Sequence, residues 1–268
     1  MPEVLGPRGA SARGPERARS FGAVAEDYDR YRPGPPADAV GWVLGPGAAD
    51  GLDLGAGTGA VSRHLGRTMP GTVVAVEPDG RMRRVLARRA PAARPVAAVG
   101  ESLPFAAASF DAVVVASAWH WMEPARTVTE VARVLRPGGR FGVLWNGADR
   151  SADWVADLLR RPQPDQAGQI DQAGQAGRDG WRRYRSVVLP DGAPFAPPET
   201  ATFAWSTTMT VEDLVGLAST YSGMITLPDD ERAAEMARVR AGALQMIAPA
   251  SRAVVVPMAC QCWRATRL

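Results

Sequence analysis

Lysine is absent from this chain, so all 31 of its basic residues are arginines. Lysine is thereby excluded as a catalytic group. Histidine occurs only twice, at His64 and His120. We find no cluster of histidine, cysteine and acidic residues with the spacing of metal ligands, and we expect no metal site.

Cysteine is almost as rare, because only Cys260 and Cys262 occur, in an apolar run. We expect these neighbours to point to opposite faces of a strand. That arrangement would keep them from pairing with each other or from holding one metal ion. We interpret both as buried or half-buried free thiols.

Long apolar runs are also missing. No segment approaches the roughly 20 apolar residues that a membrane-spanning helix needs. Residues 1–19 are rich in arginine, glycine, proline and alanine, which is typical of a disordered basic tail. This leader has no apolar stretch of the secretory type, so we expect a cytoplasmic protein without a membrane partner.

What the chain does have is a regular alternation of apolar strand-like runs and helix-like segments between residues 20 and 150. This alternation predicts an α/β fold with a parallel sheet and helices on both faces. The predicted strands end near residues 54, 77, 100, 118 and 146. The predicted helices between them cover 59–69, 80–89 and 125–135.

Residues 151–268 carry a weaker pattern. A low-complexity insertion that repeats DQAGQ occupies about 162–180 and predicts a surface segment. Strands are expected at 199–210 and 252–268, and helices between 210 and 247. The sequence thus predicts a Rossmann-like, seven-stranded, mostly parallel sheet with an antiparallel C-terminal edge. The helices at 210–247 would form a small cap over the strand ends.

The stretch DGLDLGAGTGAVSRHLG, residues 50–66, follows the first predicted strand. Gly55, Gly57 and Ala60 would suit the G-x-G-x-x-G/A turn of a dinucleotide site. Alternatively, Gly55, Gly57 and Gly59 with Asp53 would suit a nucleoside cofactor without phosphates. A pyrophosphate favours a site without a nearby anion, so Asp53 favours the second interpretation.

Four motifs in order, LDLGAGTG, VVAVEPD, GESLPFAAASFDAVV and VLRPGGRF, carry a family resemblance. They resemble the class I S-adenosylmethionine-dependent methyltransferases, and most closely the small-molecule group that is similar to the trans-aconitate methyltransferases, also called methyltransferase type 11. The resemblance covers residues 20–150 strongly. It implies S-adenosylmethionine as the cofactor.

The resemblance also implies roles for individual residues. Asp53 would lie near the cofactor's amino group, Glu77 would accept the ribose hydroxyls, and Met82 would pack on the adenine or belong to the core. The implied cofactor-binding residues are Asp53, Gly55, Ala56, Gly57, Gly59, Glu77, Pro78, Met82, Glu101, Ser102 and Ser117. Asp111 is expected to organise structure rather than chemistry.

The methyl acceptor would lie beyond the fourth strand. His120 there could deprotonate a hydroxyl or orient a carboxylate, or it could simply pack between Trp119 and Trp121. Arg32 could pair with an acceptor carboxylate, which needs no general base, or it could be solvated. The candidate substrate-binding residues are Tyr28, Tyr31, Arg32, Trp119 and Tyr221.

Taken together, these features predict a methyltransferase that acts on a small molecule, with O-methylation favoured. A non-catalytic S-adenosylmethionine-binding regulator is the first alternative, and an NAD(P)-dependent oxidoreductase is the second. The N/D-P-P-Y/F motif of base-modifying methyltransferases is absent, so no nucleic-acid partner is expected. The chain would act as a monomer or a homodimer.

Overall fold

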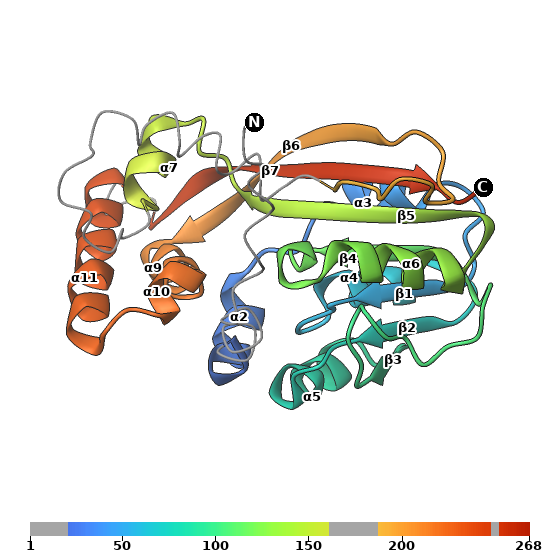
Figure 1. Ribbon diagram of the computed structural model, residues 1–268. Helices are drawn as coiled ribbons and strands as arrows, with labels where there is room; N and C mark the ends of the chain where they lie inside the picture. The colour runs from blue at the N-terminus through green and yellow to red at the C-terminus, as the bar shows by residue number, and fades with distance from the viewer. Residues whose placement is uncertain (1–20, 161–186, 248–251) are drawn as a thin grey trace, which may run out of the picture.

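The computed structural model describes residues 21–160, 187–247 and 252–268 (Figure 1). The predicted tail at 1–19 and the insertion at about 162–180 lie outside the described residues. None of the described helices has the length and apolar character needed to cross a membrane.

Seven strands form one sheet in the order β3-β2-β1-β4-β5-β7-β6 (Figure 1). The first five strands run parallel, and β7 pairs antiparallel with both β5 and β6. This confirms the predicted fold class. The strands are β1 (Gly51–Leu54), β2 (Val73–Val76), β3 (Ala93–Val96), β4 (Phe110–Ala116), β5 (Leu135–Ala148), β6 (Glu199–Thr210) and β7 (Ala253–Thr266).

Helices cover both faces of the parallel part of the sheet. One face packs against α6, and the other packs against α3, α4 and α5. Strands β1 and β2 have every residue buried, as expected for strands covered on both sides. The helices of this half are η1 (Phe21–Val24), α2 (Ala25–Tyr31), α3 (Ala37–Leu44), α4 (Ala60–Thr68), α5 (Gly80–Arg89), η2 (Trp119–Trp121) and α6 (Pro124–Val134).

The second half adds a cap with an apolar core of its own. Strands β5, β6 and β7 run out of the main sheet and into this cap (Figure 1). Helix α2 lies between the cap and α5, and it contacts α9 on one side and α5 on the other (Figure 1). The cap helices are α7 (Asp153–Leu158), α9 (Val211–Ser219), α10 (Ser222–Ile225) and α11 (Asp229–Met246).

Two local expectations are corrected. The sequence predicts a turn at RPGGR before the fifth strand, but this stretch forms part of β5 itself, which begins at Leu135 and shifts register against β4 between Phe110 and Ala112. A bulge absorbs the extra residues, and Gly138 supplies a φ of 81°. Cys260 and Cys262 lie on the same face of β7, because side chains two apart in a strand share a face. Both thiols are buried and form no disulfide, with their Sγ atoms 3.8 Å apart.

Candidate functional site

The glycine loop turns the chain sharply at the carboxyl end of β1. Gly55, Gly57 and Gly59 adopt φ values of 71°, 57° and 89°, which side-chain-bearing residues rarely adopt. The Gly55 and Ala56 amides donate to the Val76 carbonyl, each at 2.9 Å. A Cβ on Gly57 would meet no atom within 4 Å. The loop is therefore anchored to β2, and the space beside Gly57 is open to a ligand.

Asp53 lies beneath this loop with its side chain almost completely buried. Its Oδ2 accepts a 2.6 Å hydrogen bond from the Ser62 hydroxyl, whereas Oδ1 has no protein partner. Burial raises the pKa of Asp53 to about 6, although the hydrogen bonds from Ser62 oppose this shift. A buried carboxylate oxygen that lacks a partner suits a cationic ligand group such as an ammonium.

Glu77 follows β2 directly and faces the same loop. Its Oε2 accepts from the Gly57 amide at 2.9 Å, and its Oε1 accepts from the Asp79 amide at 2.8 Å. Burial raises the pKa of Glu77, and these two amides counteract part of that rise. Each oxygen keeps a second lone pair, so the carboxylate is held in place and can still accept ligand hydroxyls.

The segment after Glu77 joins this site to the N-terminal helices. Asp79 caps α5, as its Oδ1 accepts from the Arg81 and Met82 amides. Pro78 is exposed. Met82 is buried in a small cluster with Ala25, Val85 and Tyr28. Of the two interpretations of Met82, the structure therefore supports the packing one.

The loop after β3 closes another side of the site. The Ser102 amide donates to the Val99 carbonyl at 3.2 Å, which forms a tight turn around the buried Gly100. Glu101 Oε1 accepts from the Glu123 amide at 2.7 Å. This turn places Glu101 and Ser102 beside the start of α6, with Ser102 exposed.

The end of β4 meets the glycine loop closely. A Cβ on Gly55 would approach the Ala118 Cβ to 2.6 Å. Ser117, just before it, has a φ of 54°, an uncommon conformation for a residue other than glycine. Such strained positions cluster at functional sites, which agrees with the predicted place of Ser117.

Trp119 and His120, which are neighbours in η2, differ in burial. Trp119 is buried and packs on Phe141 in the main core, so the structure does not place it at an open acceptor surface as expected. His120 is exposed, and its ring lies against Trp121 with centroids 4.6 Å apart. The predicted catalytic role of His120 stays a prediction.

The predicted substrate residues of α2 meet the cap. Arg32 Nε donates to Thr220 Oγ1 at 2.9 Å, and its Nη2 donates to the Thr220 carbonyl at 3.0 Å. Its guanidinium also lies 4.4 Å from the ring centroid of Tyr221 and 5.2 Å from that of Tyr28. Arg32 is therefore not a solvated side chain. No carboxylate of the described residues forms an ion pair with it.

A second arginine joins this cluster. Arg150, which follows β5, has its guanidinium 5.8 Å from the Tyr221 ring centroid. Burial lowers the pKa of Arg150, interactions with Tyr221 oppose that shift, and the like charge of Arg32 adds to it. Two guanidinium groups thus share one aromatic side chain at the junction of α2 and the cap.

Several residues of the site escaped sequence reasoning. Arg150 and Thr220 lie far from Arg32 in the chain, and no local pattern connects them. Ser62 could have been found, because it lies one helical turn after the glycine loop on the buried face of α4. Asp111 meets its expected structural role, since its Oδ2 accepts from the Ala49 and Asp50 amides and its Oδ1 pairs with Arg136.

The glycine loop, Asp53 and Glu77 fit a nucleoside cofactor that carries an amino group. Asp53 Oδ1 offers a buried acceptor, and Glu77 offers fixed carboxylate oxygens. The bare side of Gly57 leaves room for close approach. These residues would hold the amino group and the ribose hydroxyls of S-adenosylmethionine. Among the described residues, no three histidine, cysteine or acidic side chains are grouped to hold a metal ion.

Comparisons with known proteins identify the family of this chain. The model of a methyltransferase domain matches residues 52–143. An uncharacterized methyltransferase of Mycobacterium tuberculosis is 38% identical over 253 residues, which cover 92% of this chain and 95% of that protein. The malonyl-acyl-carrier-protein O-methyltransferase of Methylococcus capsulatus is 38% identical over 132 residues, 46% of this chain and 48% of that protein.

A solved structure extends the agreement to the fold. A protein assigned as a type II methyltransferase from Anaeromyxobacter dehalogenans is 25% identical, with a TM-score of 0.58. The match covers 88% of this chain and 98% of that chain. This chain therefore belongs to the class I S-adenosylmethionine-dependent methyltransferases, and its cofactor is S-adenosylmethionine.

Proposed function

We propose that this methyltransferase transfers the methyl group to an oxygen of a small-molecule carboxylic acid in the cytoplasm. The observation that carries the proposal is the guanidinium of Arg32, which lies between Tyr28 and Tyr221 without a carboxylate partner among the described residues. A partly buried arginine in this setting favours an anionic ligand, because guanidinium–carboxylate pairs are strong and directional.

The cofactor, when bound, supplies a methyl group already activated on a sulfonium. The acceptor carboxylate is already anionic at neutral pH, so no general base is required. One carboxylate oxygen forms the bond to the methyl carbon as the carbon–sulfur bond breaks. The electron pair of that bond stays on sulfur, and the products are a methyl ester and S-adenosylhomocysteine. The protein's task is alignment and the exclusion of water.

Two further points support this acceptor class. Thr220 fixes the Arg32 side chain through two hydrogen bonds, so little side-chain entropy is lost when the acceptor binds. The Methylococcus relative is named as an O-methyltransferase of a malonyl thioester, and a malonyl group carries a free carboxylate.

We expect the purified protein to methylate members of a panel of small carboxylic acids with S-adenosylmethionine. The products should be base-labile esters that release methanol. Arg32→Gln should raise the KM for the acid on the order of tenfold or more, because a charge-assisted contact is lost. Arg84→Gln changes the same charge at an exposed position of α5 and should leave turnover unchanged.

The contrary results are distinct. Methylation confined to phenols or alcohols, and abolished by His120→Ala, would replace the carboxylate with a hydroxyl acceptor and make His120 the base. Tight binding of S-adenosylhomocysteine without turnover on any acceptor of the panel would favour the regulatory alternative.

A further inference from the structure

Helix α2 is tied to the methyltransferase core by a nearly buried carboxylate. Asp29 Oδ1 pairs with Arg63 Nη1 at 2.9 Å, and Asp29 Oδ2 pairs with Arg89 Nε at 2.6 Å. The side chain of Asp29 is only 4% exposed. Arg63 belongs to the helix that follows the glycine loop, and Arg89 belongs to the helix that follows Glu77. One carboxylate thus joins α2 to both helices that flank the cofactor site.

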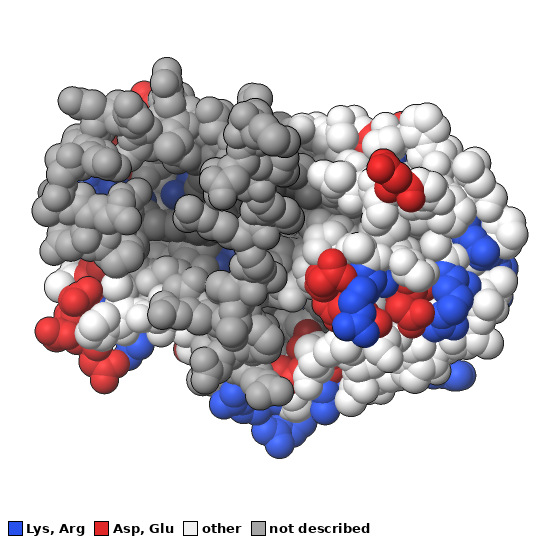
Figure 2. Space-filling view, in the orientation of Figure 1, with Lys and Arg blue, Asp and Glu red and all other residues white. Residues whose placement is uncertain are grey.

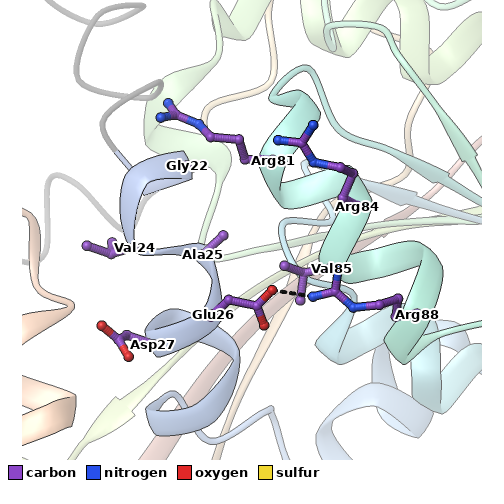
Figure 3. Close-up of a pocket in the computed structure, with 9 residues that line it drawn as sticks. All are labelled: Gly22, Val24, Ala25, Glu26, Asp27, Arg81, Arg84, Val85 and Arg88. Carbon is purple, nitrogen blue, oxygen red and sulfur yellow. Dashed lines mark hydrogen bonds and ion pairs between the residues drawn. The ribbon is translucent and has the colours of Figure 1, made fainter.

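A second ion pair between the same elements is different. Glu26 pairs with Arg88 across the groove of about 190 Å³ that separates α2 from α5 (Figure 3). Both side chains are mostly exposed, at 69% and 57%. Blue side chains gather along this edge of the molecule, where α5 lies (Figure 2). Exposed pairs contribute little, whereas breaking a buried pair by removing one partner is costly.

The far end of α2 is attached to the cap. The Tyr31 ring packs on Gly216 of α9 so closely that a Cβ there would come within 2.4 Å of it. Arg32 is hydrogen-bonded to Thr220, the C-cap residue that follows α9. Between the two ends, Ala25 and Tyr28 cover Met82 and Val85 of α5. Helix α2 therefore connects the cofactor-binding half of the sheet with the cap.

We propose that Asp29 is a positioning residue, which fixes α2 against the two helices that flank the cofactor site and thereby sets the place of Tyr31 and Arg32 beside the cap. The two arginines hold the carboxylate from two different helices, so α2 cannot rotate or slide without breaking one of the pairs. Both ion pairs are formed by residues of this chain. The effect of Asp29 on cofactor binding does not depend on which acceptor is methylated.

We expect Asp29→Asn to raise the Kd for S-adenosylhomocysteine on the order of tenfold, since a buried ion pair with two partners is lost. Isothermal titration of the full chain measures this change. Hydrogen exchange should accelerate at the amides of residues 25–32 while the strand amides stay protected. Glu26→Gln is the matched control, because it removes the same charge from the same helix, and it should change neither quantity.

A second pair of variants guards against a general loss of folding. Arg89→Gln removes only the ion pair with the more exposed of the two arginines, and its Kd should lie between those of the unaltered protein and Asp29→Asn. Asp29→Glu keeps the charge and should bind more tightly than Asp29→Asn. Unchanged affinity and unchanged exchange in Asp29→Asn, or equal effects of Glu26→Gln, would overturn the proposal. These readouts use cofactor binding alone, so a failure of the carboxylate acceptor would not produce them.

Discussion

At the scale of single residues, the site depends on two carboxylates in different environments. Asp53 has an oxygen with no protein partner, whereas both oxygens of Glu77 accept backbone amides. The resemblance of the sequence motifs assigned cofactor roles to these two residues, and the structure places both beside the glycine loop. The sequence could not predict Thr220 or Arg150 beside Arg32, because Thr220 is 188 positions away and only tertiary folding brings it there.

Cofactor affinity should depend on pH through Asp53. The pKa of Asp53 is about 6 in the free protein, and the cofactor's ammonium group would lower it by favouring the carboxylate. Affinity should therefore be constant above about pH 7 and fall up to about tenfold per pH unit below pH 6, as protons compete. Titrations with S-adenosylhomocysteine between pH 4.5 and 8 measure this dependence.

The free protein should respond in the opposite sense. A carboxyl whose pKa is raised by folding stabilises the fold fully below its ordinary pKa of 3.8, and this contribution is lost as the pH rises through about 6. Asp53→Asn should remove the contribution of Asp53 to both pH dependences and bind the cofactor weakly. An affinity that is flat with pH in the unaltered protein would assign the ammonium to another group.

At the scale of elements, the periodicity of the sequence predicts the bounds of a helix or strand well where that element is regular. Helix α5 and strands β1 and β6 have the predicted bounds, because their apolar positions or caps mark both ends. Helix α3 was missed, since prolines and glycines surround it and mask its four buried positions. The bulge in β5 was interpreted as a separate turn, because glycine chemistry looks the same in both.

Two glycines of the same loop should respond differently to alanine. Gly57→Ala places its methyl group in open space, so stability should fall only by about 1 kcal/mol for the left-handed backbone, while cofactor affinity falls tenfold or more. Gly55→Ala would clash with Ala118 and should lower stability more. Thermal unfolding and isothermal titration of both variants separate these effects. Equal losses of stability would contradict the assignment of Gly57 to the ligand side.

At the scale of the whole molecule, the cap and the cofactor half share strands. β5 and β7 pair continuously from Arg140 with Thr266 to Ala148 with Met258, and every residue of β6 pairs with a residue of β7. The boundary near residue 150 that the sequence suggested therefore falls just past the end of β5, which leads into the cap.

We expect one cooperative unfolding transition in urea, because the two apolar cores cannot separate without breaking the same ladder. Far-ultraviolet circular dichroism and tryptophan fluorescence should give the same midpoint, since Trp154 reports on the cap and Trp263 on the main core. Two separated midpoints would show that the cap unfolds by itself.

The shared strands also limit how the cap can move relative to the cofactor-binding half of the sheet. The cap continues the β-ladder of the main sheet. It cannot open about a flexible hinge, because the backbone hydrogen bonds between the shared strands would have to break. Helix α2, in contrast, is attached to the cap through side chains, with the Tyr31 ring on Gly216 and Arg32 hydrogen-bonded to Thr220. We therefore expect any motion between the cap and the cofactor-binding half to be taken up at the side-chain contacts of α2, while the shared strands β5 and β7 stay in register.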